Sequence, residues 1–433
     1  MLRATRLARS TVRSFATVVD AAGGARVAAA DNGQATSSVT VLLKAGSRYE
    51  PKPGVAHVLS NFAFKSTEKR SALGTLREAE LYGGVLSATL TREHLALTAE
   101  FLRGDEAFFV DVLASFLSSA RFTRHELEEY VLPSVLAEAE AAGLSPSTNA
   151  LELAHALAFR NGLGASLFAD AEATSDITSA DVRALSSAAL ADPSSVAVLG
   201  TGISADALAA LFSKSFAPSA SAPATTPAAA PKSAYHGGAS RVKGAHGPQT
   251  VFVGFGTANA ANVPALHALA GHVSPAPATK WAQGASPLAA AIPEGVFART
   301  VLLPYSDAAL FGLLVEGEDA KAVGAAAKSA VELLKATAGG NVAKEEVQRA
   351  VARARFAVAA GVETREGLVN AVGARLLAGE GASVQSTLDA VEKVDGAAIS
   401  KIAGELLKGK PTFVAVGDVN SLPYADEIGL TNA

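Results

Sequence analysis

A run of alanine, proline and serine divides this chain of 433 residues into two parts of similar length. Residues 217–233 read APSASAPATTPAAAPKS, with four prolines and one charged residue. Prolines at this spacing interrupt helices and sheets alike, so we expect the segment to be an extended linker. It separates an expected N-terminal domain, residues 16–216, from an expected C-terminal domain, residues 234–433.

The two parts show the same order of predicted elements. Helical periodicity and a terminal strand-like run recur in each. In the first part they fall at 123–142, 149–160, 179–190 and 194–200, with a short acidic loop before 179–190, and in the second at 344–360, 365–377, 386–391, 397–407 and 412–417. The last three matching pairs lie 216 to 218 residues apart, and the first pair lies 221 apart. Two alanine-rich parts could look alike by composition, but the shared order and spacing favour a duplication.

Strand-like segments open each part. Residues 38–43 and 250–253 are apolar and rich in β-branched residues, and 86–90 and 95–99 alternate across a short polar connection, as in a hairpin. Strands and helices interleave without a steady βαβ rhythm. We therefore predict an α+β fold of two homologous halves, each a mixed β-sheet layered with α-helices.

Composition narrows the possible functions. Hydrophobic residues make up 49% of the chain and charged residues 18%, which is ample material for a buried core. The chain has no cysteine, so disulfides, thiolate zinc sites and a cysteine nucleophile are excluded. No continuous apolar run reaches the ~20 residues of a membrane span, so any membrane association is expected to be peripheral.

The first fifteen residues differ from the rest of the chain. They carry Arg3, Arg6, Arg9 and Arg13 and no acidic residue, and on a helix the arginines share one side. This is typical of a mitochondrial transit peptide, residues 1–15, cleaved after Phe15; the alternative is a basic surface helix. Without these residues, 33 basic residues stand against 41 acidic ones. That balance argues against a nucleic-acid partner.

The segment at 54–67 contains His57, Ser60 and Asn61. It resembles the inverted zinc motif H-x-x-E-H of the inverzincin peptidases, in which two histidines on one helix bind zinc and the glutamate is the general base. Here only the first histidine of that pattern is present. A serine replaces the base and an asparagine replaces the second ligand.

By the same resemblance, the distal glutamate ligand of such a site corresponds to Glu138. Two ligands fall short of the three that catalytic zinc sites use, Asn61 offers only a neutral amide, and Ser60 cannot act as a base near neutral pH. We therefore predict no catalytic residue and no bound metal or cofactor, with His57 hydrogen-bonded on its helix. His267 and His272, five residues apart, are not spaced as a metal pair on a helix.

Several segments together carry a wider resemblance. They are 44–50 (KAGSRYE), 91–94 (TREH), 98–103 (TAEFLR), 235–238 (YHGG) and 305–312 (YSDAALFG). They resemble the core protein 2 family of the mitochondrial cytochrome bc1 complex, which is related to the mitochondrial processing peptidase (family M16). The resemblance covers nearly the whole chain after the transit peptide.

The resemblance implies a fold and a role. Two bowl-like halves would face each other across a cavity, in a non-catalytic structural subunit that supports assembly of ubiquinol–cytochrome c reductase. The subunit would lie on the matrix side of the mitochondrial inner membrane, paired with a core protein 1-like subunit. Its other partners would be cytochrome b, cytochrome c1 and the iron–sulfur protein, which hold the haem and iron–sulfur groups.

Two alternatives stay open from the sequence. The first is the presequence-binding α subunit of the processing peptidase, but its glycine-rich loop has no counterpart at 271–291, where prolines and alanines prevail. The second is an active metallopeptidase, which Ser60 and Asn61 oppose.

Overall fold

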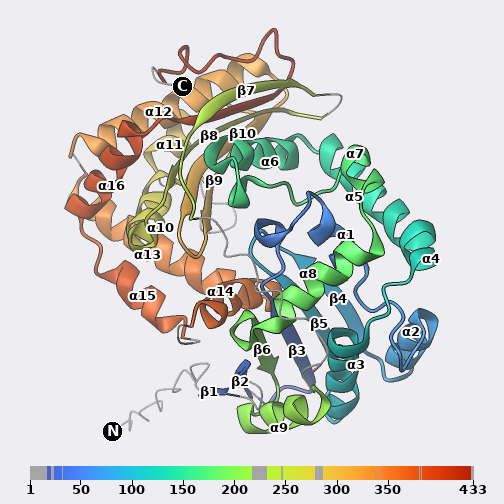
Figure 1. The fold of residues 1–433 in the computed structure, drawn as a ribbon. Helices are drawn as coiled ribbons and strands as arrows, with labels where there is room; N and C mark the ends of the chain where they lie inside the picture. The colour runs from blue at the N-terminus through green and yellow to red at the C-terminus, as the bar shows by residue number, and fades with distance from the viewer. Residues whose placement is uncertain are drawn as a thin grey trace, which may run out of the picture.

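The computed structural model describes residues 17–20, 24–31, 33–216, 232–244, 247–277, 286–340, 342–379, 381 and 383–430. The predicted transit peptide and most of the predicted linker lie outside the described residues. The ribbon shows two sheets with their helices, one from each part of the chain (Figure 1).

The first sheet has six strands in the order β1-β2-β6-β3-β5-β4. Only β2 and β6 run parallel; the other neighbours are antiparallel. The strands are β1 (Thr17–Asp20), β2 (Arg26–Ala30), β3 (Thr36–Leu43), β4 (Val85–Leu90), β5 (Leu95–Leu102) and β6 (Val196–Thr201). The predicted hairpin is confirmed as β4 and β5, which pair Leu90 with Leu95 at the turn.

The second sheet repeats this arrangement with five strands in the order β7-β11-β8-β10-β9. Its one parallel pair, β7 and β11, corresponds to β2 and β6. The strands are β7 (Gly238–Lys243), β8 (Gln249–Thr257), β9 (Val296–Pro304), β10 (Ala309–Gly317) and β11 (Thr412–Gly417). The predicted α+β class, with a mixed sheet in each half, is confirmed.

One face of each sheet is covered by helices of its own half. In the first half the main core contains side chains from α1 (Val55–Asn61), α3 (Glu106–Ser119), α8 (Ser179–Ala191) and α9 (Ala205–Ser215). In the second half the core contains side chains from α10 (Val263–Val273), α12 (Ala320–Ala338) and α16 (Gly396–Lys408). Alternate strand residues point into these cores, as the period of a pleated strand requires.

The other face of each sheet is covered by a helix from the opposite half. Helix α6 (Pro146–Phe159) packs its alanines and Phe159 against Phe252, Val414 and Val416 of the second sheet. Helix α14 (Arg365–Ala378) packs Leu368, Val372 and Leu376 against Leu42 and Leu199 of the first. The first sheet uses strands from residues 17–201 and the second uses strands from 238–417, but the packing exchanges one helix in each direction.

Contact between α14 and β3 is close enough to require glycine. A Cβ added to Gly373 would lie 2.3 Å from Cδ2 of Leu42. Helix α14 therefore approaches the sheet more closely than an alanine at this position would allow.

The predicted helices are present. That at 123–142 is α4 (Arg124–Glu126), a π-helical segment (Leu127–Val131) and α5 (Leu132–Leu144). The remaining helices are α2 (Ala72–Leu81), α7 (Ala171–Ser175), α11 (Pro287–Ala291), α13 (Lys344–Gly361) and α15 (Gln385–Glu392). Among the helices so described, none is both long and apolar enough to cross a membrane.

Thr123 is followed three residues later by Glu126, a pattern that predicts a capping box at the start of this helix, but the prediction is wrong. The Thr123 hydroxyl donates to Oε2 of Glu126 at 2.6 Å, and no side chain caps the helix there. Oε1 of Glu126 accepts the Ser66 backbone N–H at 3.1 Å. A tertiary partner thus takes the carboxylate that a local motif would use.

Candidate functional site

Helices α1 and α5 bring three of the four predicted site side chains together. Nε2 of His57 lies 2.7 Å from Oε2 of Glu138, and Nδ2 of Asn61 lies 3.1 Å from the same oxygen. His57 and Asn61 are four residues apart on α1 and therefore share a face of the helix. The ring of His57 is hydrogen-bonded, but to Glu138 on α5 and to the Ala169 N–H, and not on its own helix as predicted.

A backbone group fixes the protonation of the His57 ring. Nδ1 of His57 accepts the Ala169 N–H at 3.1 Å, so this nitrogen carries no proton. The neutral ring must then hold its proton on Nε2, which donates it to Glu138. A zinc ligand needs a free lone pair on the coordinating nitrogen. In this arrangement Nε2 is a donor, and the contact is a hydrogen bond of a neutral histidine.

The two substituted positions are also occupied by hydrogen bonds. The Ser60 hydroxyl turns back to donate to the carbonyl oxygen of His57 at 2.8 Å, away from Glu138. The Asn61 amide donates to Glu138 and, at 3.4 Å, to the carbonyl of His57. Over the described ranges, no three histidine, aspartate or glutamate side chains gather as metal ligands do.

Glu50 lies at the start of α1, next to this site. Its Oε2 accepts the Ala56 backbone N–H at 3.1 Å, and the Gly54 N–H also bonds to the carboxylate. These bonds satisfy donors that the first turn of a helix leaves open. Burial raises the pKa of Glu50 to about 7 despite them. Nothing in the spacing of the zinc-like motif marks Glu50 as part of the site.

A second polar cluster joins the two halves. The buried Arg48 guanidinium donates to Oε1 of Glu93 at 2.7 Å and, through both terminal nitrogens, to Asp307 at 2.8 and 2.7 Å. The Ser233 backbone N–H and hydroxyl also donate to Asp307, each at 2.9 Å. Burial alone would raise the pKa of Asp307, but the bonds from Arg48 and Ser233 hold it below its usual value.

We call this cluster the Arg48 junction (Arg48, Glu93, Ser233, Ser306 and Asp307). It contains residues of three of the segments that carry the family resemblance. Ser306 donates its backbone N–H and its hydroxyl to Glu93, at 3.0 and 2.5 Å. Segments 44–50, 91–94 and 305–312 therefore meet at one contact between the halves.

A further set of bonds connects the junction to His57. Arg92 donates to Oε1 of Glu152 at 2.5 Å and to the carbonyl of Ala165. Oε2 of Glu152 accepts the Leu167 N–H at 3.0 Å. These bonds hold the loop that ends at Ala169, whose N–H orients the His57 ring. The orientation of His57 thus depends on a loop fixed next to the junction.

Two aromatic side chains close the junction from the α6 side. Nδ1 of His155 donates to the carbonyl of Leu151 at 2.6 Å, so Nε2 accepts the Tyr305 hydroxyl at 2.7 Å. Burial, with the charge of Arg92, lowers the pKa of His155 to about 3. Burial raises the pKa of Tyr305 to about 12. Both groups are neutral at physiological pH and act as a fixed hydrogen-bonded pair.

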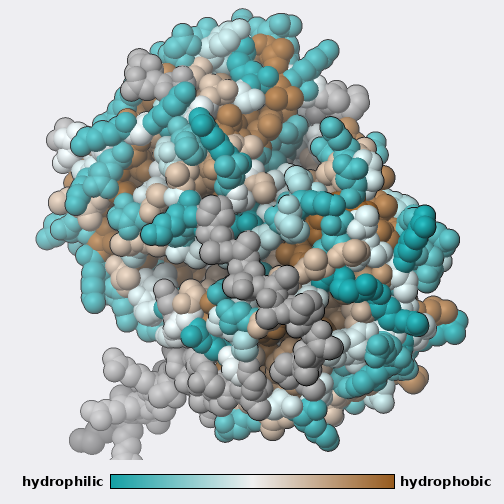
Figure 2. Space-filling model, in the orientation of Figure 1, coloured by the Kyte–Doolittle hydropathy of each residue, from teal (hydrophilic) through white to brown (hydrophobic). Residues whose placement is uncertain are grey.

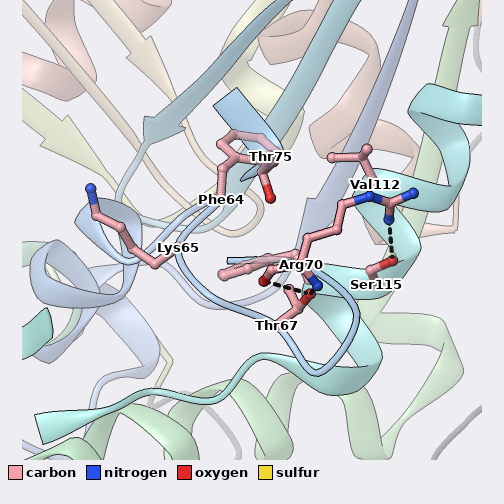
Figure 3. Close-up of a pocket in the computed structure, with 8 residues that line it drawn as sticks. Phe64, Lys65, Thr67, Arg70, Thr75, Val112 and Ser115 are labelled. Atoms are coloured by element: carbon pink, nitrogen blue, oxygen red, sulfur yellow. Dashed lines mark hydrogen bonds between the residues drawn. The ribbon is translucent and has the colours of Figure 1, made fainter. Parts of the chain in front are cut away.

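Two other features do not form a site. His267 and His272 both lie on α10, where burial lowers the pKa of each, and neither belongs to a group of three metal-ligating side chains in the described part of the chain. A small pocket beside α3 is lined by Arg70, which bonds to Asp111 at 2.9 Å and to the Ser115 hydroxyl (Figure 3). Since the pocket leaves essentially no room even for a water molecule, we regard it as part of the packing.

Comparison with known proteins gives the family. Residues 26–171 match the model of the insulinase family, peptidase family M16. A cytochrome b-c1 complex subunit 2 of Cryptococcus neoformans is 49% identical over 421 residues, which cover 94% of each chain. Those of Yarrowia lipolytica and Neurospora crassa are 35% and 38% identical, covering 94% of this chain and 95% and 90% of their own lengths. The chain belongs to the family of mitochondrial cytochrome b-c1 complex subunit 2, whose fold is that of the M16 peptidases.

Proposed function

We propose that this chain is a structural, non-catalytic core subunit of the mitochondrial ubiquinol–cytochrome c reductase, the cytochrome b-c1 complex. The observation that carries the proposal is the similarity along nearly the whole chain to relatives of that name, at 49% identity for the Cryptococcus neoformans protein. The function is to support assembly and stability of the complex.

The geometry at His57 supports the absence of catalysis. A metallopeptidase needs an open metal position and a base that takes a proton from the bound water. Here Nε2 of His57 donates to Glu138, Asn61 occupies the same carboxylate oxygen, and Ser60 bonds to its own helix. The former site ties α1 to α5, and we assign no catalytic, metal-binding or cofactor-binding residue.

The proposal also covers the domain organisation of the chain, its location in the cell and its partner subunits. Residues 1–15 are a transit peptide, 16–216 and 234–433 are the two peptidase-like domains, and 217–233 is the linker between them. The chain associates peripherally with the inner membrane on its matrix side. It pairs with a core protein 1-like subunit and contacts cytochrome b, cytochrome c1 and the iron–sulfur protein.

The proposal is tested in mitochondria whose copy of this chain is removed and replaced by variants. Loss of the chain should lower the amount of assembled complex and its quinol–cytochrome c reductase activity, and leave presequence cleavage intact. Ser60→Ala should restore assembly and activity to the level of the unaltered chain. Normal complex assembly without the chain, or loss of presequence cleavage, would contradict the proposal.

A further inference from the structure

The negative charge of this chain is concentrated in one region. Residues 127–181 contain nine acidic residues and one basic residue, Arg160. In 16–126 and 182–433 together, 32 basic residues balance 32 acidic ones. The region spans the π-helical segment, α5, α6 and α7. In Figure 1, α4, α5 and α7 lie along the right-hand edge of the molecule, where Figure 2 shows brown atoms among teal ones.

Within this region, α5 has an unpartnered face. Only Val135 of its thirteen residues is buried, although the helix is rich in leucine and alanine. Tyr130 just before it is 59% exposed, and Leu144 at its end is 52% exposed. We define the α5 face by its exposed residues: Glu129, Tyr130, Pro133, Leu136, Ala137, Glu140, Ala141 and Leu144.

The α5 face differs in composition from a helix surface that is exposed to solvent. Helix α13 provides the comparison, since its first turns expose Lys344, Glu345, Gln348 and Arg349. The α5 face instead combines large apolar side chains with acidic ones. An apolar helix face left open in a folded chain is typical of a contact with another molecule.

The negative charge around the α5 face restricts the class of molecule that can bind there. Three of the nine acidic residues are paired with cations from outside the region: Glu128 with Arg124, Glu152 with Arg92, and Asp181 with Lys52. The remaining excess of five acidic residues, with Arg160 counted, repels anionic lipid headgroups and nucleic acids. A helix with an apolar stripe flanked by lysine or arginine would bury its stripe on Leu136 and Leu144. It would place its charges beside Glu129 and Glu140.

We propose that the α5 face binds a basic amphipathic helix of another subunit of the assembled complex. This inference rests on the proposed function, because it takes the partner from that complex. The contact occurs beside the former metallopeptidase site: Glu138, which faces His57, is on the same helix.

The first test is a photo-crosslinker placed at Ala141 in the intact complex. The matched control is Gln348 on α13, which is also exposed on a helix. We expect a crosslink from Ala141, but not from Gln348, to a basic helical segment of one other subunit. Adducts only with lipid or within this chain, or equal crosslinking from both positions, would overturn the proposal.

The second test reverses charge. The pair Glu129→Lys with Glu140→Lys should reduce the Ala141 crosslink by about tenfold, and more at low salt than at high salt. The control pair Glu332→Lys with Glu345→Lys changes net charge equally, at exposed positions on α12 and α13, and should leave the crosslink unchanged. Equal yields from both variants, with unaltered thermal unfolding, would contradict the role of charge.

These experiments separate the two proposals. If the tagged chain does not copurify with the haems of the complex, the proposed function fails. If it copurifies and Ala141 contacts no other subunit, only the present inference fails.

Discussion

Removing the Arg48 guanidinium should destabilise the whole chain, because it is buried between two carboxylates that belong to different parts of the fold. In Arg48→Met, the side chains of Glu93 and Asp307, which are 12% and 33% exposed, lose their common cation. Breaking a buried ion pair by deleting one partner costs about 3–5 kcal/mol. Since Asp307 is partly exposed and keeps two bonds from Ser233, we expect the low end, about 3 kcal/mol.

The measurement is urea unfolding of the purified chain at neutral pH, with Arg124→Met as the matched control. Arg124 makes an equally short contact with Glu128, 2.7 Å, but is 86% exposed, so its removal should leave the free energy of unfolding unchanged. Combining Arg48→Met with Asp307→Asn should cost less than the sum of the two single changes. The reasoning is refuted if Arg48→Met and Arg124→Met have the same stability, or if the two changes at the junction are additive.

Three further predictions concern the helices around the site. The Glu50 pKa of about 7 in the folded chain exceeds its ordinary 4.5, so its contribution to stability is present below pH 4.5 and is lost as the pH rises through 7. The free energy of unfolding of the unaltered chain should therefore fall by about 3 kcal/mol between pH 4.5 and pH 7, and Glu50→Gln should abolish this fall. An equal dependence of the unfolding free energy on pH in the two chains would contradict this. Asn61→His adds a third side chain next to His57 and Glu138 but should leave the chain without stoichiometric zinc by metal analysis, because Nδ1 of His57 accepts the Ala169 N–H and Nε2 keeps its proton. Uptake of about one equivalent of zinc would contradict this assignment of the His57 proton. Gly373→Ala should cost about 1–3 kcal/mol of unfolding free energy by forcing α14 from Leu42. Gly404→Ala, with no atom near the added Cβ, should not destabilise, and equal effects would refute the close-packing argument.

Part of each sheet and about half of the helices could be predicted because their signals are local, whereas β9, β10 and α12 were not among the predicted elements. Alternation over 86–90 and 95–99 specifies a hairpin by itself, and the recurring helix order specifies a second copy of the same layers. The exchange of α6 and α14 could not be predicted. The apolar face of α14 shows that Leu368 and Val372 are buried, but periodicity does not say which sheet covers them.

The sequence indicates which side chains form the site around His57, but not the hydrogen bonds that they make. His57, Asn61 and Glu138 meet as the resemblance implies, yet the group that sets the His57 tautomer is the backbone N–H of Ala169, 112 residues away. A backbone donor leaves no mark in the sequence. Glu50 and Arg48 are charged residues of segment 44–50, but nothing in the neighbouring sequence indicates that both side chains are largely buried. The capping box predicted at Thr123 does not form because the Glu126 carboxylate accepts the backbone N–H of Ser66, which is distant in sequence.

The most direct test of the proposed function is native electrophoresis of gently solubilised mitochondria that carry a tagged form of this chain. The band should be examined for the haem absorbance of cytochromes b and c1 and for presequence cleavage. We expect the tag to migrate with both haems in one large assembly, without cleaving activity attributable to this chain. Migration as a small soluble heterodimer that cleaves presequences and contains no haem would contradict it.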